Sequence, residues 1–220
     1  MTTLLEGDFR VISPGVVYSN EYIKSNCNYT TNEVIGNKII PKTVQYEFKT
    51  QKNVPKLGLM MVGWGGNNGS TVTAGILANK LRVSWSTKEG LKHPNYFGSL
   101  TQASTINIGT DSEGATVYIP FKNILPMVNP NDFVLGGWDI SKVNLGASMQ
   151  RAQVLDYDLQ QKLLPHMKEI VPLPSIYYPD FIAANQSERA DNLLCGSKQQ
   201  NLNDIRSHIK NFKLEKANLQ

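Results

Sequence analysis

The chain has 220 residues, of which 40% are hydrophobic and 18% are charged, an ordinary balance for a globular protein of one or two domains. Its net charge of +4 is small and its lysines and arginines are scattered, so the sequence lacks the basic stripe that nucleic-acid-binding proteins carry. Two cysteines far apart and three histidines without ligand spacing argue against a disulfide framework or a metal site, and no apolar segment approaches the roughly 20 residues of a membrane span.

Residues 1–55 predict an extended N-terminal arm with short strands. No secretory signal is recognisable at its start, so we expect a cytoplasmic protein that contacts no membrane. Within the arm, Thr43–Lys49 alternates apolar and polar side chains, which is typical of a half-buried strand. The apolar positions are Val44, Tyr46 and Phe48.

A glycine–asparagine loop follows the arm and lies between an apolar run and a helical segment. Leu57–Val62 is apolar or glycine throughout, which is typical of a strand covered on both faces, and the helix after the loop is expected to end near Leu81. Strand, glycine loop and helix in this order form a cradle for phosphate, because bare backbone N–H groups and the positive end of the helix dipole attract anions. The loop residues that we assign to this cradle are Gly63, Gly65, Gly66, Asn67, Asn68 and Gly69.

The spacing of these glycines favours a dinucleotide over other ligands. The common dinucleotide fingerprint is G-x-G-x-x-G, and here the last glycine falls at Gly69, one residue later. A triphosphate-binding loop fits less well, because no lysine follows Gly69. A tight turn that binds nothing is the alternative, although so many glycines in one turn cost more conformational entropy than a plain turn requires.

The segments between the first helix and the second strong strand give weaker signals. Val83–Gly98 is polar and rich in turn residues, so we expect a loop insertion there. Ser104–Ile108 and Thr116–Ile119 predict two short strands, separated by the turn Asp111–Gly114.

Phe133–Trp138 predicts the second buried strand, and the strand ends in Asp139. Ligands of open α/β sheets bind at the carboxyl ends of strands, where an acidic residue can accept the ribose hydroxyls of a dinucleotide. Asp139 fits this role better than Glu89, which lies near the usual sequence distance from the glycines but in a polar loop. An Asp at this point can equally be the N-cap of the following helix, and the sequence leaves both interpretations open.

Two amphipathic helices complete the pattern. The first runs from Leu145 to Leu163 and is expected to end at Pro165, and the second carries apolar residues at helical spacing between Leu202 and Phe212. Strands that alternate with such helices indicate an α/β fold, with a Rossmann-like doubly wound parallel sheet over residues 56–220. This sheet would be incomplete, because about six strands are normal and only two are strong here.

The stretch Pro172–Asn192 combines three prolines, two tyrosines and a dense polar run, which is unusual for a plain loop. A ligand contact or a contact between subunits would explain this composition. No Ser–His–Asp or Cys–His arrangement accompanies it, so the residues alone assign no catalytic group.

Five motifs along the chain are long enough to be specific to one family. They are Gly63–Thr71, Lys92–Ser99, Leu125–Val128 with Pro130–Phe133, Gly137–Ile140 and Leu173–Asn192. Together they resemble the inositol-3-phosphate synthase (myo-inositol-1-phosphate synthase) family, from about Val44 to Phe212. This family carries the wide G-x-G-G-N-N-G form of the loop.

The resemblance implies the conversion of D-glucose 6-phosphate to 1D-myo-inositol 3-phosphate in inositol and phospholipid biosynthesis. It implies that NAD accepts a hydride from C5 of the substrate, that the keto sugar enolises and closes as an aldol, and that the hydride then returns. It further implies a homo-oligomer, usually a tetramer, whereas the scattered charges of the sequence lead us to expect no nucleic-acid partner.

Carried over by position, the family's cofactor contacts support Asp139 as a ligand and add residues of the proline-rich stretch. They are Gly65, Gly66, Asn67 and Asn68 in the loop, and Asp139, Ser175, Ile176, Gln186 and Arg189 beyond it. Members of the family are more than twice as long as this chain, and their catalytic and phosphate-binding motifs are absent from it. The resemblance therefore implies a truncated form whose isolated chain is inactive, or a non-catalytic fragment that binds NAD or associates with full-length subunits.

Overall fold

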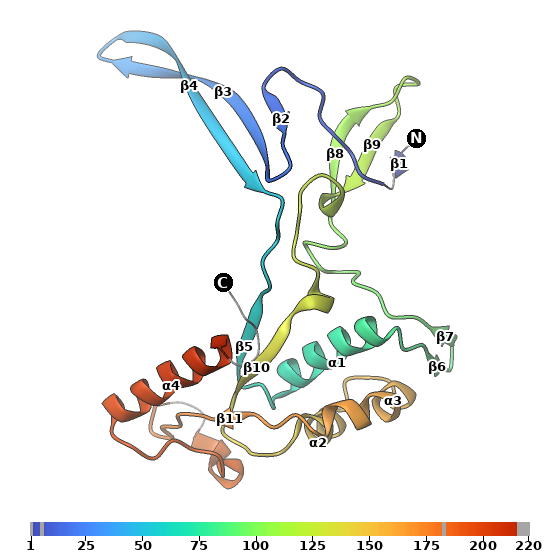
Figure 1. Cartoon of the computed structure of the whole chain (residues 1–220), viewed down its shortest axis with the longest axis vertical. Helices are drawn as coiled ribbons and strands as arrows, with labels where there is room; N and C mark the ends of the chain where they lie inside the picture. Colours follow the sequence, from blue (N-terminus) through green and yellow to red (C-terminus); the bar gives the residue numbers. More distant parts are fainter. Residues whose placement is uncertain (1, 5–6, 182–183, 215–220) are drawn as a thin grey trace. The chain divides into compact units, whose positions relative to one another are not determined.

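The computed structural model, shown in Figure 1, describes residues 2–4, 7–181 and 184–214. Two positions of the proline-rich motif, 182–183, and the last six positions of the expected Rossmann-like domain lie outside this described part. The chain forms two compact units.

The first unit combines Met1–Val54 with Phe97–Val128, and the second combines Pro55–Tyr96 with Asn129–Gln220. The sequence led us to expect a single boundary, after residue 55. The structure differs because the strand pair within Phe97–Val128 joins the N-terminal strand β1 (Thr2–Leu4) and not the parallel sheet of the second unit.

Antiparallel strands make up most of the first unit. β3 (Tyr22–Ile35) and β4 (Lys38–Gln51) form a hairpin with 14 residues in each strand, and β2 (Val16–Tyr18) pairs with the other edge of β3. The arm therefore contains short strands, β1 and β2, and also a hairpin of two long strands. The predicted alternation does lie in β4, but Tyr46 and Phe48 are 46% and 55% exposed. The alternation shows which residues share a face and not whether another element covers that face.

The predicted pair of short strands is confirmed as β8 (Thr105–Thr110) and β9 (Thr116–Pro120), which run antiparallel. Asp111 sets the turn between them, because its Oδ1 accepts from two backbone N–H groups further along the turn, at 2.9 Å each. Val117 and Ile119 of β9 are buried, so this small sheet provides core residues of the first unit.

A three-stranded parallel sheet forms the centre of the second unit, in the order β11 (Leu173–Pro174), β10 (Val134–Asp139), β5 (Gly58–Val62). Both strong strands of the sequence analysis are confirmed, whereas β11 is too short to show a pattern of its own. In Figure 1, α1 (Asn67–Leu81) lies on one side of β5 and β10 and α4 (Lys198–Phe212) lies on the other. Helices on both faces of a short parallel sheet confirm the incomplete Rossmann-like α/β fold.

The burial of β5 differs from the expectation of a strand covered on both faces. Its first four residues are half-buried, and Val62 at its end is 85% exposed. In β10, by contrast, the last four residues, Gly136–Asp139, are all buried. β10 is therefore the better covered strand of the sheet.

The long helix expected up to Leu163 is in fact two helices, α2 (Leu145–Ala152) and α3 (Tyr157–Met167). α2 ends because Gln153 adopts a left-handed conformation, with a φ of +51°, and donates its N–H to the carbonyl four residues back. Pro165 does not stop α3 but lies in its last turn, where the missing N–H removes a single helical hydrogen bond. The predicted helix α1 is confirmed and ends at Leu81, as expected.

Helices α1, α2 and α3 enclose the main core of the second unit. Its buried members are Trp64, Ala74, Ala78, Leu145, Met149, Leu159, Leu163 and Met167. The expected loop insertion after α1 contains a small hairpin, β6 (Trp85–Thr87) with β7 (Gly90–Lys92). Trp85 packs against the core, and its Nε1 donates to Asp156 Oδ2 at 2.6 Å. Trp85 therefore attaches the otherwise polar Val83–Gly98 segment to the core.

The predicted last helix is confirmed as α4, which docks on β10. A capping box between Ser197 and Gln200 fixes its N-terminus. Phe212 packs so closely on Gly136 that a Cβ at this glycine would lie 2.6 Å from the ring. Trp138 Nε1 donates to His208 Nδ1 at 3.0 Å, which adds a polar contact between the strand and the helix.

Replacing His208 by leucine should destabilise the second unit. Trp138 is 6% exposed, and an indole N–H left without an acceptor costs about 1–3 kcal/mol. All three tryptophans of the chain lie in the second unit, so urea unfolding followed by tryptophan fluorescence measures the change there. His166→Leu, at an exposed position of α3, is the matched control, and equal midpoints for the two variants would contradict the prediction.

Candidate functional site

The glycine loop leaves the end of β5 and is tied to the neighbouring strand. The backbone N–H groups of Gly63 and Trp64 both donate to the carbonyl of Trp138 in β10, at 2.9 Å each. Gly63 has a φ of +75°, a conformation in which a side chain would be strained. The N–H of Gly66 then donates to the Gly63 carbonyl at 2.9 Å, which closes the turn into α1.

Trp64 holds the loop to the first turns of α1. Its side chain is 4% exposed and belongs to the main core. Its Nε1 donates to Thr73 Oγ1 at 2.8 Å, and that hydroxyl donates to the Gly69 carbonyl at 2.9 Å. A Cβ at Gly69 would overlap the backbone of Trp64, so the close approach of loop and helix requires glycine at this position.

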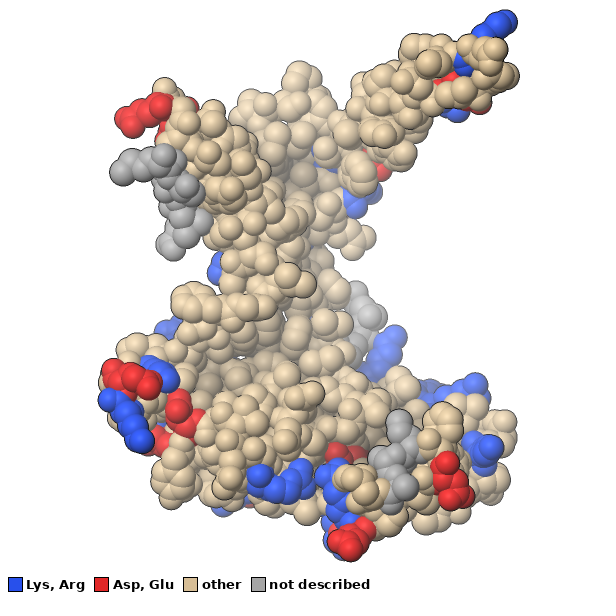
Figure 2. All heavy atoms as spheres, turned by 180° about the vertical axis from the view of Figure 1, so that it is seen from behind, with Lys and Arg blue, Asp and Glu red and all other residues tan. Residues whose placement is uncertain are grey.

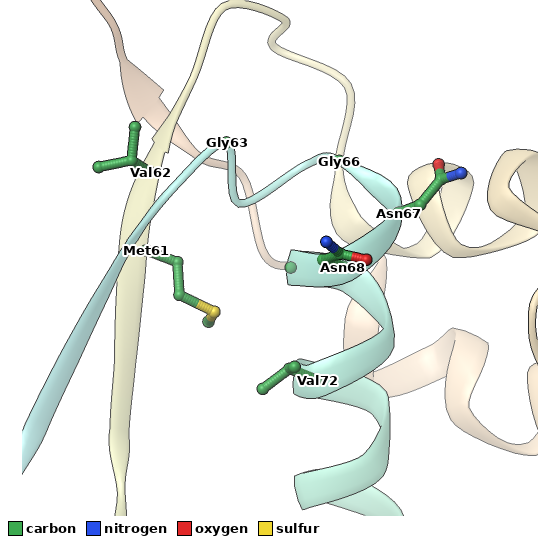
Figure 3. A pocket seen from close by; sticks show the side chains of 8 residues that line it. Met61, Val62, Gly63, Gly66, Asn67, Asn68 and Val72 are labelled. Carbon is green, nitrogen blue, oxygen red and sulfur yellow. The ribbon is translucent and has the colours of Figure 1, made fainter.

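The N-terminus of α1 opens onto a cleft of about 410 Å³. The N-cap, Gly66, has no side chain, the first turn carries no acidic residue, and no side chain in the described chain caps it. The positive end of the helix dipole is therefore available to an anion. Figure 3 shows Met61 of β5 and Val72 of α1 pointing toward each other across the cleft. Five of the six predicted loop residues line it: Gly63, Gly66, Asn67, Asn68 and Gly69.

Gly65, the sixth loop residue, lies against the end of β10 instead. A Cβ at Gly65 would lie 3.1 Å from Asp139 Cγ and 3.2 Å from Asp139 Oδ2. Because glycine has no Cβ, the carboxylate can sit directly beside the loop backbone. The structure therefore brings the loop and Asp139 together, as the sequence analysis expected for a dinucleotide site.

Asp139 is the last residue of β10 and is 1% exposed. Its Oδ1 accepts from Arg189 Nη2 and from the backbone N–H of Ser141, both at 2.9 Å. Its Oδ2 is buried and has no hydrogen-bond partner among the described residues, and the same is true of Arg189 Nε. An unsatisfied buried carboxylate oxygen is costly, so the burial of this atom is not offset by a donor among the described residues.

The alternative interpretation, in which Asp139 caps the following helix, is wrong. α2 begins after Asn144, whose side chain accepts from the backbone N–H of Ala147 at 2.9 Å. Asn is as strong an N-cap residue as Asp, so the sequence contained this signal. The carboxylate of Asp139 is therefore not used to start a helix.

The proline-rich segment, Pro172–Asn192, is held beside the end of β10. β11 begins the segment and pairs with the last residues of β10. Asn192 holds its other end, because its backbone N–H donates to the Ile140 carbonyl at 2.9 Å and its Nδ2 donates to the Asp139 carbonyl at 3.0 Å. The Ser175 N–H donates to the Asn192 carbonyl at 3.0 Å. In the sequence, Asn192 stands out only as part of a polar run, since these contacts join distant parts of the chain.

The predicted residues of this segment are placed unequally with respect to Asp139. Arg189 contacts it directly, and Ser175 follows β11 at the end of the sheet. Ile176 and Gln186 are half-buried, and Gln186 Nε2 donates to its neighbour Asn185 at 3.2 Å. Within the described part of the chain, no hydrogen bond or ion pair joins Ile176 or Gln186 to the loop or to Asp139.

Arg151 is a residue of this site that the sequence analysis missed. It lies in the last turn of α2, and its Nη2 donates to the Gly65 carbonyl at 2.6 Å. In the sequence it looks like an ordinary polar residue of an amphipathic helix. Its contact with the loop spans 86 residues and depends on where α2 ends, so no local pattern reveals it.

The described residues give no sign of a metal site or of a membrane-spanning helix. On the face shown in Figure 2, acidic and basic side chains lie intermixed. The described residues contain no group of three His, Cys, Asp or Glu side chains that could hold a metal ion. Of the helices described, none is both long and apolar enough to cross a bilayer. The charges at the site itself come from Asp139, Arg151 and Arg189.

A parallel strand, a glycine loop that opens onto a helix N-terminus and a carboxylate at the end of the neighbouring strand define a dinucleotide-binding α/β domain. A family model of an NAD-binding domain, described as Myo-inositol-1-phosphate synthase, matches residues 57–220. The chain therefore belongs to the myo-inositol-1-phosphate synthase family, and the matched domain is the one that binds NAD. The resemblance found in the sequence is confirmed.

Similar proteins and a solved structure lead to the same family. The chain is 52% identical to inositol-3-phosphate synthase of Dictyostelium discoideum, over 97% of this chain and 42% of that protein. It is 53% identical to inositol-3-phosphate synthase 1 of Homo sapiens, over 93% of this chain and 38% of that protein. The crystal structure of inositol-3-phosphate synthase from Caenorhabditis elegans matches with a TM-score of 0.89 at 45% identity, over 94% of this chain and 42% of that one. The chain thus spans about two fifths of the length of these relatives.

Asp191 should make the docking of the proline-rich segment sensitive to acid. The backbone N–H of Lys142 donates to Asp191 Oδ1 at 2.9 Å, and this bond holds the pKa of the carboxyl below its ordinary value of 3.8. A carboxyl whose pKa is lower in the folded state than in the unfolded state stabilises the fold at pH values above its unfolded-state pKa. This stabilisation is lost as the pH falls through the pKa of the folded state. Asp191→Asn should therefore be less stable than the wild type at neutral pH, with a difference that disappears on acidification.

Denaturation midpoints measured from about pH 7 down to about pH 2 test this pH dependence. Asp204→Asn, at an exposed position of α4, is the matched control and should change stability little at any pH. A difference between Asp191→Asn and the wild type that stays constant with pH would contradict the prediction.

Proposed function

We propose that this chain forms the NAD-binding part of an inositol-3-phosphate synthase, an isomerase that converts D-glucose 6-phosphate to 1D-myo-inositol 3-phosphate. The observation that carries the proposal is the match of residues 57–220 to the NAD-binding family model, because this range contains the whole loop and Asp139. Relatives that are inositol-3-phosphate synthases support the reaction. The substrate and a homo-tetrameric assembly are proposed for the whole family protein, of which this chain spans about two fifths.

Three features of the site fit a dinucleotide. The cleft at the start of α1 offers bare backbone and a helix N-terminus to a pyrophosphate. Side chains at Gly66 or Gly69 would push against the loop backbone, so the cradle exists only because these positions are glycine. The buried Oδ2 of Asp139 lacks a donor that a ribose hydroxyl would supply.

Bound at this site, NAD would supply a reversible hydride acceptor for a reaction that is redox-neutral overall. The residues of this chain would bind and orient the cofactor. Gly66, Asn67 and Asn68 would hold the phosphates through the N-terminus of α1, and Asp139 would accept a ribose hydroxyl. Arg189 would keep the Asp139 carboxylate oriented through their 2.9 Å ion pair. Ser175, Ile176 and Gln186 are proposed as further cofactor contacts from the segment beside β10.

The charged groups of this site favour binding over proton transfer. Enolisation and aldol closure need a general acid or base that exchanges protons near neutral pH. Arginine guanidiniums stay protonated under these conditions, and Asp139 is engaged by Arg189 and by the Ser141 N–H. We therefore assign cofactor binding, and no proton transfer, to the described residues of this site.

Calorimetry with NAD tests the proposed cofactor site. The 220-residue chain should bind NAD, and Gly66→Val should abolish binding, because a Cβ at Gly66 would already lie 3.0 Å from the Gly63 carbonyl oxygen. Gly75→Ala is the matched control, since Gly75 also lies in α1 and a Cβ there meets no atom within 4 Å. It should bind NAD as the wild type does. A wild-type chain that binds no NAD would contradict the proposed site.

The 220-residue chain by itself should not turn over glucose 6-phosphate. The physical reason is that the charged groups described at its cofactor site, Asp139, Arg151 and Arg189, contact one another or the loop backbone, and none is placed to serve as a general acid or base. The assay incubates the purified chain with NAD and glucose 6-phosphate and follows inositol phosphate by chromatography, with a full-length relative as the positive control. NAD-dependent product above background would show that the chain holds catalytic groups as well.

A further inference from the structure

The side chain of Arg151 contacts the backbone of the glycine loop. Its Nη2 donates to the Gly65 carbonyl oxygen at 2.6 Å. We propose that Arg151 is a positioning residue that holds the loop in the shape that accepts the pyrophosphate of NAD. This proposal rests on the NAD-binding function proposed above.

The peptide group between Gly65 and Gly66 is held at both of its polar atoms. A trans peptide is planar, so its C=O and N–H point in opposite directions. Arg151 binds the carbonyl, and the Gly66 N–H donates to the Gly63 carbonyl at 2.9 Å. The orientation of this peptide sets the direction in which the chain enters α1. It therefore also sets where the unpaired N–H groups of the first turn point.

Arg151 is attached to a rigid part of the unit. In α2, Leu145 is 0% exposed and Met149 is 2% exposed, and both belong to the main core. A Cβ at Gly146 would lie 2.9 Å from Leu164, so α2 packs tightly against α3. The loop has four glycines in seven residues, and glycine is the most conformationally free residue. A fixed guanidinium can therefore order a loop that its own sequence leaves loose.

The positive charge of Arg151 also contributes to the electrostatic potential at the loop. Among the described residues, Arg151 forms no ion pair with a carboxylate, so its charge is not neutralised locally. The loop itself contains no lysine, and a helix dipole supplies only about half a unit charge. A hydrogen bond from a charged donor is stronger than a neutral one. Arg151 therefore both fixes the Gly65 peptide and raises the local potential for a pyrophosphate.

The test compares Arg151→Met with Arg206→Met in the 220-residue chain. Methionine keeps an apolar stem and removes the charge and the donors, and Arg206 loses the same charge from an exposed position of α4. We expect Arg151→Met to weaken NAD binding roughly tenfold or more by calorimetry, and Arg206→Met to stay within about twofold. Arg151→Lys keeps a charged donor and should recover part of the affinity.

Amide hydrogen exchange without ligand separates positioning from a general loss of stability. Arg151→Met should speed exchange at Gly66 and in the first turn of α1 by a larger factor than in β10. Arg151→Lys should slow the loop exchange again.

The other possible results also bear on the positioning role of Arg151. Equal NAD affinity for the wild type and Arg151→Met would overturn the inference and leave the proposed cofactor site standing. Weaker binding together with exchange that speeds up by the same factor throughout the unit would also overturn it. If the wild type binds no NAD, the proposed function fails and exchange alone decides: faster exchange confined to the loop supports the positioning role, and unchanged loop exchange overturns it.

Discussion

The rest of the site depends on Trp64, which connects the glycine loop to the sheet, to the core and to α1. Its backbone N–H binds the Trp138 carbonyl in the sheet, its indole lies in the core, and its Nε1 binds Thr73 in α1. Ordering a loop costs about 1–2 kcal/mol per residue in backbone entropy, and burying one large apolar side chain stabilises by about 1.5–3 kcal/mol. One ring therefore cannot order seven residues alone. The contacts of Gly65 with Asp139 and Arg151 are part of what holds the loop.

Asp139 couples this loop to the proline-rich segment. One carboxylate oxygen is satisfied by Arg189, which comes from that segment, and the other is buried beside Gly65 without a donor. A buried carboxylate oxygen without a donor destabilises the fold. Since Asn192 fastens the segment to the Asp139 carbonyl, the orientation of the carboxylate depends on the docking of the segment as well as on the strand. The site is therefore complete only when both are in place.

The sequence predicts those parts of the site in which neighbouring residues act together. The strand, the loop and α1 follow one another directly, and Asp139 directly follows a buried strand, so local patterns locate them. The break between α2 and α3 escapes prediction because Gln153 adopts a left-handed conformation that usually requires glycine. The role of Arg151 cannot be predicted either, because no local sequence pattern indicates that a helical arginine binds a carbonyl 86 residues away. β11 is set by pairing with β10 and not by its own two residues.

The late position of the last glycine in the loop corresponds to the path of the backbone at Trp64. In the common fingerprint the last glycine permits close packing of helix and strand. Here the backbone of Trp64 occupies the space beside the first turn of α1, and a Cβ at Gly69 would overlap it. Gly69 therefore has the role of the usual third glycine, although it falls one residue later, and Gly65 is required by the carboxylate of Asp139. The displaced last glycine thus corresponds to a neighbour that the helix must clear, and the first two glycines keep the usual G-x-G spacing.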